Sequence, residues 1–187
     1  MNFRDRLFAE YCIPESLSIF GGDGLQTFPV ADLDVLISTC VEELQSDVYV
    51  TEYTYAGSMG TQLPQDAFAV VSAKLNAGFQ GNRQVRFTFD SSTKICWLRA
   101  YPSTITYRRL LRLDDLDSGK IRGDQLRYVK TYILWKMAEK EYSTLSPVVL
   151  DADNGSFNLS AIKEFAESRH TAFASMKDEI FIYTGGA

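Results

Sequence analysis

Histidine is almost absent from this sequence, and cysteine is rare. His170 is the only histidine in 187 residues, so a catalytic triad, a histidine metal site or a histidine base would each depend on it. The three cysteines, Cys12, Cys40 and Cys96, are far apart and form no Cys-x-x-Cys pair, which argues against a disulfide framework and against a zinc site. We therefore expect free thiols and a solvent-exposed His170.

The sequence also lacks an excess of positive charge and any long apolar run. Its net charge is -5 and its pI is about 4.9, whereas proteins that grip the phosphate backbone need clustered lysine and arginine. No stretch approaches the roughly 20 apolar residues of a membrane-spanning helix, and Met1–Arg6 carries charges of both signs. These features predict a chain with no signal peptide or membrane anchor, which stays in a cytosol-like compartment and is not expected to bind nucleic acid.

What is present is the composition of a folded globular protein. Hydrophobic residues make up 45% of the chain and charged residues 23%, and the length suits one domain with a substantial core. We expect a single domain over residues 1–187, with N-terminal helices within 1–47. Apolar residues at helical spacing predict one helix over 2–12 and a second whose apolar stripe runs from Leu33 to Leu44.

Residues 48–111 form a β-rich middle section. Val48–Tyr55 is dominated by β-branched and aromatic residues, which predicts a strand. Val85–Phe89 and Lys94–Arg99 flank a polar turn, a pattern that predicts a hairpin. The next segment, Tyr101–Leu111, is either a third strand or the approach to the following helix.

Three more helices are expected. Residues 64–79 place apolar side chains on one side of a helix that ends near a glycine. Residues 123–145 carry an aliphatic stripe and an aromatic stripe on different faces, so this helix must contact two neighbours. Asn158 caps a last helix, which completes a C-terminal helical hairpin over 123–178, and a terminal β tail follows at 179–185. The predicted fold class is α+β, with several helices and the long C-terminal helical hairpin packed against a small antiparallel sheet.

No group of residues predicts catalytic chemistry. The glycine-rich segment 21–24 lacks the spacing and the Lys-Ser/Thr pair of a phosphate-binding loop. An acidic patch, which lacks the alternating ligands and distal glutamate of a calcium loop, comprises Asp114, Asp115, Asp117 and Asp124. The segment 151–155 begins like such a loop, but its twelfth position is Ile162 rather than glutamate. We therefore expect no enzymatic activity, no catalytic residues, no cofactor and no metal.

Aromatic residues are abundant, with 10 tyrosines and 12 phenylalanines. Tyrosine and arginine are enriched at protein interfaces, although core packing alone also accounts for such numbers. The candidate interface residues are Tyr53, Tyr55, Arg108, Arg109, Tyr132, Trp135, Ile180, Phe181 and Ile182. The last three belong to the predicted β tail, which we expect to add as a strand to the sheet edge of a neighbouring copy.

A series of segments runs in the same order through roughly the C-terminal half of the chain. It consists of TITYRR at 104–109, YVKTYILWKMAEKE at 128–141, DNG at 153–155 and FNL at 157–159. This series resembles the virion structural proteins of large contractile-tailed bacteriophages. Within that group it is most similar to neck or head-to-tail connector proteins, and less similar to tail or baseplate components.

The resemblance implies a structural subunit that forms a ring with copies of itself and contacts the neighbouring portal, neck and tail proteins of a virion. It also implies assembly in the host cytoplasm, with nucleic acid present only as the genome passing through a channel. Two other interpretations come from the residues themselves. One is a small-molecule or peptide-binding module lined by aromatic side chains, and the other is a metal-dependent hydrolase or nuclease that uses the acids between Asp114 and Asp124.

Overall fold

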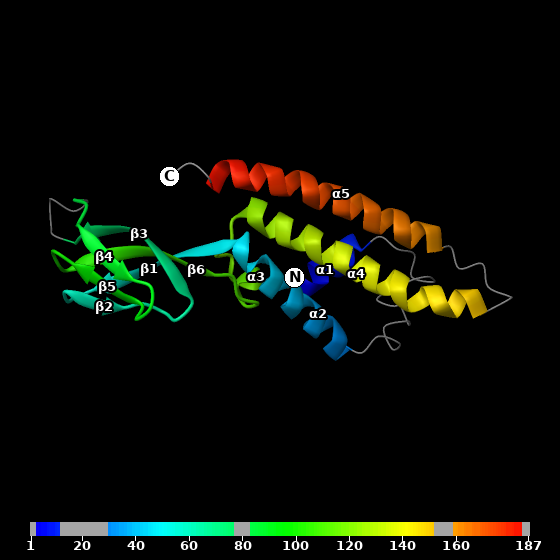
Figure 1. Cartoon of the computed structure of the whole chain (residues 1–187), viewed down its shortest axis with the longest axis horizontal. Coiled ribbons are helices and arrows are strands. Elements are labelled where there is room, and N and C mark those ends of the chain that lie inside the picture. The colour runs from blue at the N-terminus through cyan, green and yellow to red at the C-terminus, as the bar shows by residue number, and fades with distance from the viewer. Residues whose placement is uncertain (1–2, 12–29, 77–82, 152–158, 185–187) are drawn as a thin grey trace. The chain divides into compact units, whose positions relative to one another are not determined.

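A computed structural model describes residues 3–11, 30–76, 83–151 and 159–184. Its internal contacts divide the chain into two compact units (Figure 1). The helical unit contains residues 1–44 and 116–187, and the β unit contains residues 45–115. The sequence predicted a single domain instead. The difference arises because the middle segment buries a hydrophobic cluster of its own and so forms a separate core.

The described residues of the helical unit form four main helices. A fifth, very short helix spans the boundary between the two units in the sequence. The bounds are α1 Phe3–Glu10, α2 Val30–Glu43, α3 Asp115–Ser118, α4 Gly123–Asp151 and α5 Leu159–Thr184. A short 3₁₀ helix, η2, follows α2 at Leu44–Ser46. Helices α4 and α5 run antiparallel and side by side (Figure 1), which confirms the predicted C-terminal hairpin and, with the strands below, the α+β class.

Helix α4 contacts neighbours on two sides, as its two stripes predicted. Val129, Ile133 and Met137 of the aliphatic stripe are fully buried. The aromatic stripe meets α5, where Tyr128 stacks on Phe173 with ring centroids 4.7 Å apart, and α4 also packs against α2. Helix α4 is therefore the central helix of the unit, since it packs against both α5 and α2.

The predicted β tail at 179–185 is wrong. Residues 180–183 form the final turns of α5, which continues to Thr184. Each residue added to an existing helix gains a backbone hydrogen bond, whereas an isolated β-prone segment gains none until it finds a partner strand. Helix α4 also runs past its predicted end, through Pro147 to Asp151.

The described part of the β unit forms two three-stranded antiparallel sheets, with strand orders β1-β6-β3 and β2-β5-β4 (Figure 1). The strands are β1 Tyr49–Ala56, β2 Gly60–Gln62, β3 Ala67–Leu75, β4 Phe87–Asp90, β5 Ile95–Leu98 and β6 Ser103–Leu110. The core that they share is formed by Ala56, Leu63, Ala67, Ala73, Val85, Cys96, Leu98, Ile105 and Tyr107. Tyr101–Leu111, which the sequence left open, therefore supplies a central strand.

The prediction of a helix over 64–79 is also wrong, because most of this segment forms strand β3. It pairs along its length with β6, and the pairing register shifts between Ala67 and Ala69 and again between Val70 and Ser72. Such bulges break the strict alternation of buried and exposed residues. The pattern therefore resembles helical spacing, and only the partner strand identifies the segment as β.

The predicted hairpin over 85–99 is confirmed as strands β4 and β5. Its turn is held by the Asp90 carboxylate, which accepts hydrogen bonds from the Ser92 hydroxyl at 2.7 Å and the Thr93 hydroxyl at 2.8 Å. These donors, with the backbone N–H groups of the same two residues, lower the pKa of Asp90 well below its usual value. Lys94 follows in the left-handed region, with a φ of 60°.

Candidate interaction surface

Strand β1 presents tyrosines on the outer face of its sheet. Its burial alternates, with Val50 and Ala56 at 1% and 0% exposure on the inner face. On the opposite face Tyr53 is 71% exposed and Tyr55 is 65% exposed. Strand β1 is also an edge of the β1-β6-β3 order. Among the described strands it pairs on one side only, so it offers side chains and backbone groups for contact with another chain.

Neighbouring strands extend this surface. The Arg108 guanidinium of β6 lies over the Tyr49 ring at 4.3 Å, and Phe68 of β3 meets the same ring edge-on at 6.3 Å. We define the aromatic sheet face as Tyr49, Tyr53, Tyr55, Phe68 and Arg108. It combines aromatic area with one stacked arginine, which is the residue mixture that is enriched where proteins bind proteins.

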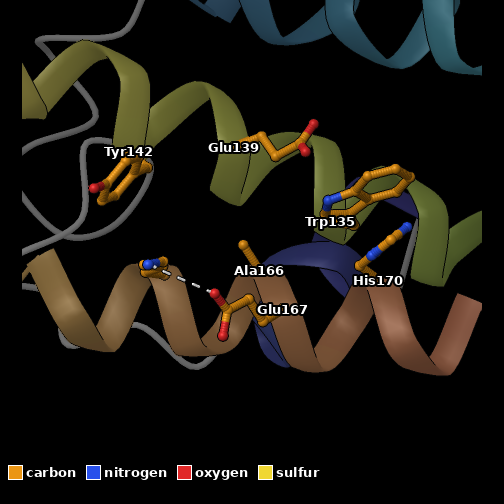
Figure 2. Close-up of a pocket in the computed structure, with 7 residues that line it drawn as sticks. Trp135, Glu139, Tyr142, Ala166, Glu167 and His170 are labelled. Carbon is orange, nitrogen blue, oxygen red and sulfur yellow. Dashed lines mark ion pairs between the residues drawn. The ribbon is translucent and has the colours of Figure 1, made fainter.

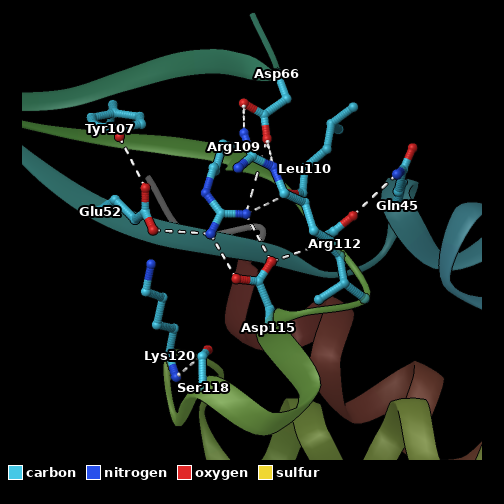
Figure 3. A network of polar contacts seen from close by, with 11 residues as sticks. Gln45, Glu52, Asp66, Tyr107, Arg109, Leu110, Arg112, Asp115, Ser118 and Lys120 are labelled. Carbon is cyan, nitrogen blue, oxygen red and sulfur yellow. Dashed lines mark hydrogen bonds and ion pairs between the residues drawn. The ribbon is translucent and has the colours of Figure 1, made fainter. Parts of the chain in front are cut away.

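Arg109 lies on the opposite side of β6, because successive residues of a strand point to opposite faces. Its side chain is 2% exposed and donates to both carboxylate oxygens of Asp115, at 2.6 and 2.7 Å (Figure 3). It also donates to Glu52 at 2.9 Å, and Asp66 lies 3.9 Å away. These partners, Asp115 above all, hold the pKa of Arg109 above its usual range. Of the two arginines predicted for the interface, only Arg108 therefore belongs to the aromatic sheet face.

Tyr107 connects to the same network, since its hydroxyl donates to Glu52 at 3.0 Å (Figure 3). Burial and this hydrogen bond raise the pKa of Tyr107 from 10.0 to about 12. Between pH 10 and pH 12 the unfolded chain therefore binds fewer protons than the folded chain, and stability is lost as the pH rises. We expect the urea concentration at the unfolding midpoint of the β unit to decrease from pH 10 to pH 12. In Tyr107→Phe this decrease should be smaller, because the titrating phenol is absent.

The two tryptophans make this measurable, because Trp97 lies in the β unit and Trp135 in the helical unit. In a Trp135→Phe background, the fluorescence of Trp97 reports the β unit alone. Tyr53→Phe serves as the matched control, since it removes an exposed phenol from the same sheet. An equal loss of stability in the Tyr107→Phe and parent chains would assign the effect to another group.

Tyr132 and Trp135 lie on α4 in the helical unit, where both pack against Phe173 of α5. The Tyr132 hydroxyl donates to Glu43 of α2 at 2.6 Å. Each side chain is partly buried, so both act first as packing residues between helices. The remaining predicted interface residues, Ile180, Phe181 and Ile182, fall in the last turns of α5, and their side chains lie outside the described part of the structure.

A pocket of about 440 Å³ opens between α4 and α5 (Figure 2). Its lining residues are Trp135, Glu139, Tyr142, Lys163, Ala166, Glu167 and His170. His170 is exposed, as the sequence predicted, and it also lies against the Trp135 ring, with centroids 4.4 Å apart. An indole and an imidazole flanked by carboxylates suit a small aromatic or cationic group. This pocket was not predicted from the sequence, although Trp135 and Tyr142 stand two helical turns apart on one face of α4.

The acidic patch proposed from sequence is divided among separate structural contacts. Asp115 binds Arg109, whereas Asp117 accepts from the Phe3 backbone N–H at 2.5 Å and lies 3.3 Å from Arg6. Asp124 pairs with Arg122 at 2.8 Å. Three of the four carboxylates thus contact different arginines, and the fourth, Asp114, is exposed. The other acidic candidate, 151–155, and the glycine-rich segment 21–24 lie outside the described residues, apart from Asp151 as the last residue of α4.

Within the described ranges, no group of three or more histidine, cysteine, aspartate or glutamate side chains is placed to hold a metal ion. No described helix combines the length and hydropathy needed to cross a membrane. Compared with the models of known protein families and with the curated proteins, the chain matches none.

Proposed function

We propose that this chain is a structural subunit of a bacteriophage virion, a neck or head-to-tail connector protein that forms a ring through protein–protein contacts. It acts through its surfaces, with no cofactor and no catalysed reaction. Its partners are copies of itself and the adjoining portal, neck and tail proteins. A tail or baseplate subunit of the same virion is the nearest variant of this proposal.

The main support is the aromatic sheet face of the β unit. Two tyrosines more than 60% exposed stand next to each other on an edge strand, and a third is covered by Arg108. Exposed aromatic side chains that are clustered, rather than scattered singly, are typical of protein interaction sites. The resemblance of the C-terminal half to connector-type virion proteins supports the same conclusion independently.

A connector subunit is expected to assemble, so the first test is its oligomeric state. We expect mass photometry and sedimentation velocity of the purified chain, alone and mixed with candidate portal, neck or tail proteins, to reveal rings or defined complexes. The double variant Tyr53→Ser/Tyr55→Ser should weaken that assembly by about ten-fold or more, because clustered aromatic residues dominate interface energetics.

Leu113→Ser is the matched control, because it also replaces an exposed apolar side chain of the β unit by serine. Leu113 is 46% exposed and does not belong to the aromatic sheet face. A chain that remains monomeric at every concentration and binds none of the candidate partners would contradict the connector proposal.

The pocket between α4 and α5 favours a second candidate, a small-molecule or peptide-binding module. Its partly buried Trp135 and the adjacent imidazole of His170 offer ring faces to a ligand. A ligand that binds only the folded state raises the melting temperature. This function predicts such a shift from a panel of small aromatic and cationic compounds, and its loss in Trp135→Leu.

A further inference from the structure

Charge is distributed unevenly between the two units. Residues 45–115, the β unit, contain eight basic and six acidic residues and so have a net charge of +2. The net charge of the whole chain is -5, so the residues of the helical unit carry a net charge of -7. Oppositely charged surfaces on one molecule favour head-to-tail association of its copies, because the positive part of one copy attracts the negative part of the next.

Four of the eight basic residues of the β unit lie at one end of its sheets. Backbone hydrogen bonds join the strand ends there, from Leu75 N to Arg83 O at 3.0 Å and from Arg99 N to Arg86 O at 3.0 Å. On the sheet β1-β6-β3, Thr104 pairs with Tyr55 on one side and with Lys74 on the other. Residues that are far apart in sequence thus meet at a single end of the unit.

We define the basic tip by the exposed side chains at this end. It consists of Lys74, Arg83, Arg86, Arg99, Tyr55 and Tyr101. The strand ends that meet there, 53–62, 70–76, 83–88 and 97–104, contain no aspartate or glutamate. In the part of the chain that the structure describes, none of the four cations forms an ion pair. The basic tip therefore presents four cations beside two largely exposed tyrosines.

A complementary surface lies on α2 of the helical unit. The sequence of this helix contains four acidic residues and no basic one. Glu42 is exposed, the Asp34 side chain is 58% exposed although Arg4 lies 3.3 Å from it, and Val35 between them in sequence is 64% exposed. Because Val35 and Glu42 are seven residues apart, they share one face of the helix. We define this acidic α2 face as Asp34, Val35, Thr39 and Glu42.

We propose that the basic tip of one copy binds the acidic α2 face of the next copy. The contact is heterologous, so repeating it generates a closed ring when the rotation between copies permits. This inference rests on the proposed function and specifies which surfaces make the ring. A nucleic-acid ligand is less favoured because the whole chain carries -5 and would repel phosphate, whereas tyrosine beside arginine is the composition of protein interfaces.

Charge reversal tests the contact directly. The tip variant Arg86→Glu/Arg99→Glu and the α2 variant Thr39→Lys/Glu42→Lys should each weaken self-association by about ten-fold or more, since each sets like charges against one another. Mixing the two variants should restore assembly to within about three-fold of the parent chain. In a ring in which the two variants alternate, the acidic tip of the tip variant meets the basic α2 face of the α2 variant. The basic tip of the α2 variant meets the acidic α2 face of the tip variant, so every contact joins opposite charges.

Sedimentation velocity over a range of concentrations and salt measures the association, with circular dichroism to verify folding. Arg122→Glu/Arg127→Glu makes the same change in charge on exposed positions of the helical unit and is the matched control. If Arg86→Glu/Arg99→Glu failed to fold, the single variant Arg99→Glu would replace it. Self-association of Arg99→Glu alone, of the α2 variant alone and of their mixture would then test the same contact.

The outcomes separate this inference from the proposed function. Rings that form equally well in the parent chain and both variants would overturn the inference and leave the connector proposal intact. A parent chain that never assembles, alone or with virion partners, would overturn both. Loss of duplex DNA binding in the tip variant, measured by fluorescence anisotropy, with unchanged self-association would overturn the inference and assign the basic tip to nucleic acid.

Discussion

Replacing Arg109 by methionine is expected to lower the free energy of unfolding of the β unit by about 3–5 kcal/mol. The Asp115 carboxylate is 3% exposed, and Arg109 donates to both of its oxygens. Methionine cannot donate, so the buried Asp115 carboxylate would lose both of these charged hydrogen bonds and would keep the neutral one from the Arg112 backbone N–H at 2.8 Å. Urea unfolding, followed by Trp97 fluorescence in the Trp135→Phe background, measures the loss.

Arg112→Met provides the matched control. Its guanidinium pairs with Asp66 at 2.6 Å, but the Arg112 side chain is 53% exposed, so we expect a loss of about 1 kcal/mol or less. The double variant Arg109→Met/Asp115→Leu should recover much of the stability, because it removes both buried charges together. Equal losses in Arg109→Met and Arg112→Met would show that burial does not set the strength of this network.

Replacing Phe173 by alanine is expected to lower the free energy of unfolding of the helical unit by about 3–5 kcal/mol. Phe173 is 8% exposed and lies among the aromatic side chains of α4, with ring centroids 4.7 Å from Tyr128 and 4.8 Å from Tyr132. Truncation removes the side chain that joins α5 to α4 at this level and leaves a cavity between the helices. Urea unfolding of a Trp97→Phe background, followed by Trp135 fluorescence, reports this unit alone.

Ser175→Ala, two residues further along α5, is the appropriate comparison because Ser175 is exposed. We expect its effect to stay within about 0.5 kcal/mol. The loss of unfolding free energy in Phe173→Leu should lie between the losses in Phe173→Ala and Ser175→Ala, since leucine fills part of the same space. If Phe173→Ala lowers the free energy of unfolding no more than Ser175→Ala does, residues other than this aromatic group hold α4 and α5 together.

Local patterns were sufficient for those elements whose signal lies within their own residues. The apolar stripes of α1, α2 and α4 and the β-branched run of β1 each predicted the correct type of structure. The turn at Asp90 was predictable for the same reason, because its hydrogen bonds join residues within three positions. In each case the side chains that specify the element are neighbours in sequence.

The types of residue at the interaction surface were predictable from the sequence, but not which individual residues form it. An abundance of tyrosine and arginine pointed to contacts, and Tyr53 and Tyr55 are indeed exposed. The basic tip had no counterpart in the sequence patterns, because its cations come from segments that meet only through pairing between strands. Long-range pairing leaves little trace in any single stretch of sequence.

The sequence by itself determined the α+β class, the amphipathic helices and the hairpin turn, since these depend on local spacing. Only the tertiary structure decided that β3 is a strand, because β6 supplies its hydrogen-bonding partner, and that residues 180–183 continue α5. It also decided that Arg109 is buried while Arg108 lies on the outer face. The free energy of burying Arg109 depends on Glu52 and Asp115, one of which is 57 residues away in the chain, and local sequence carries no information about such a distant partner.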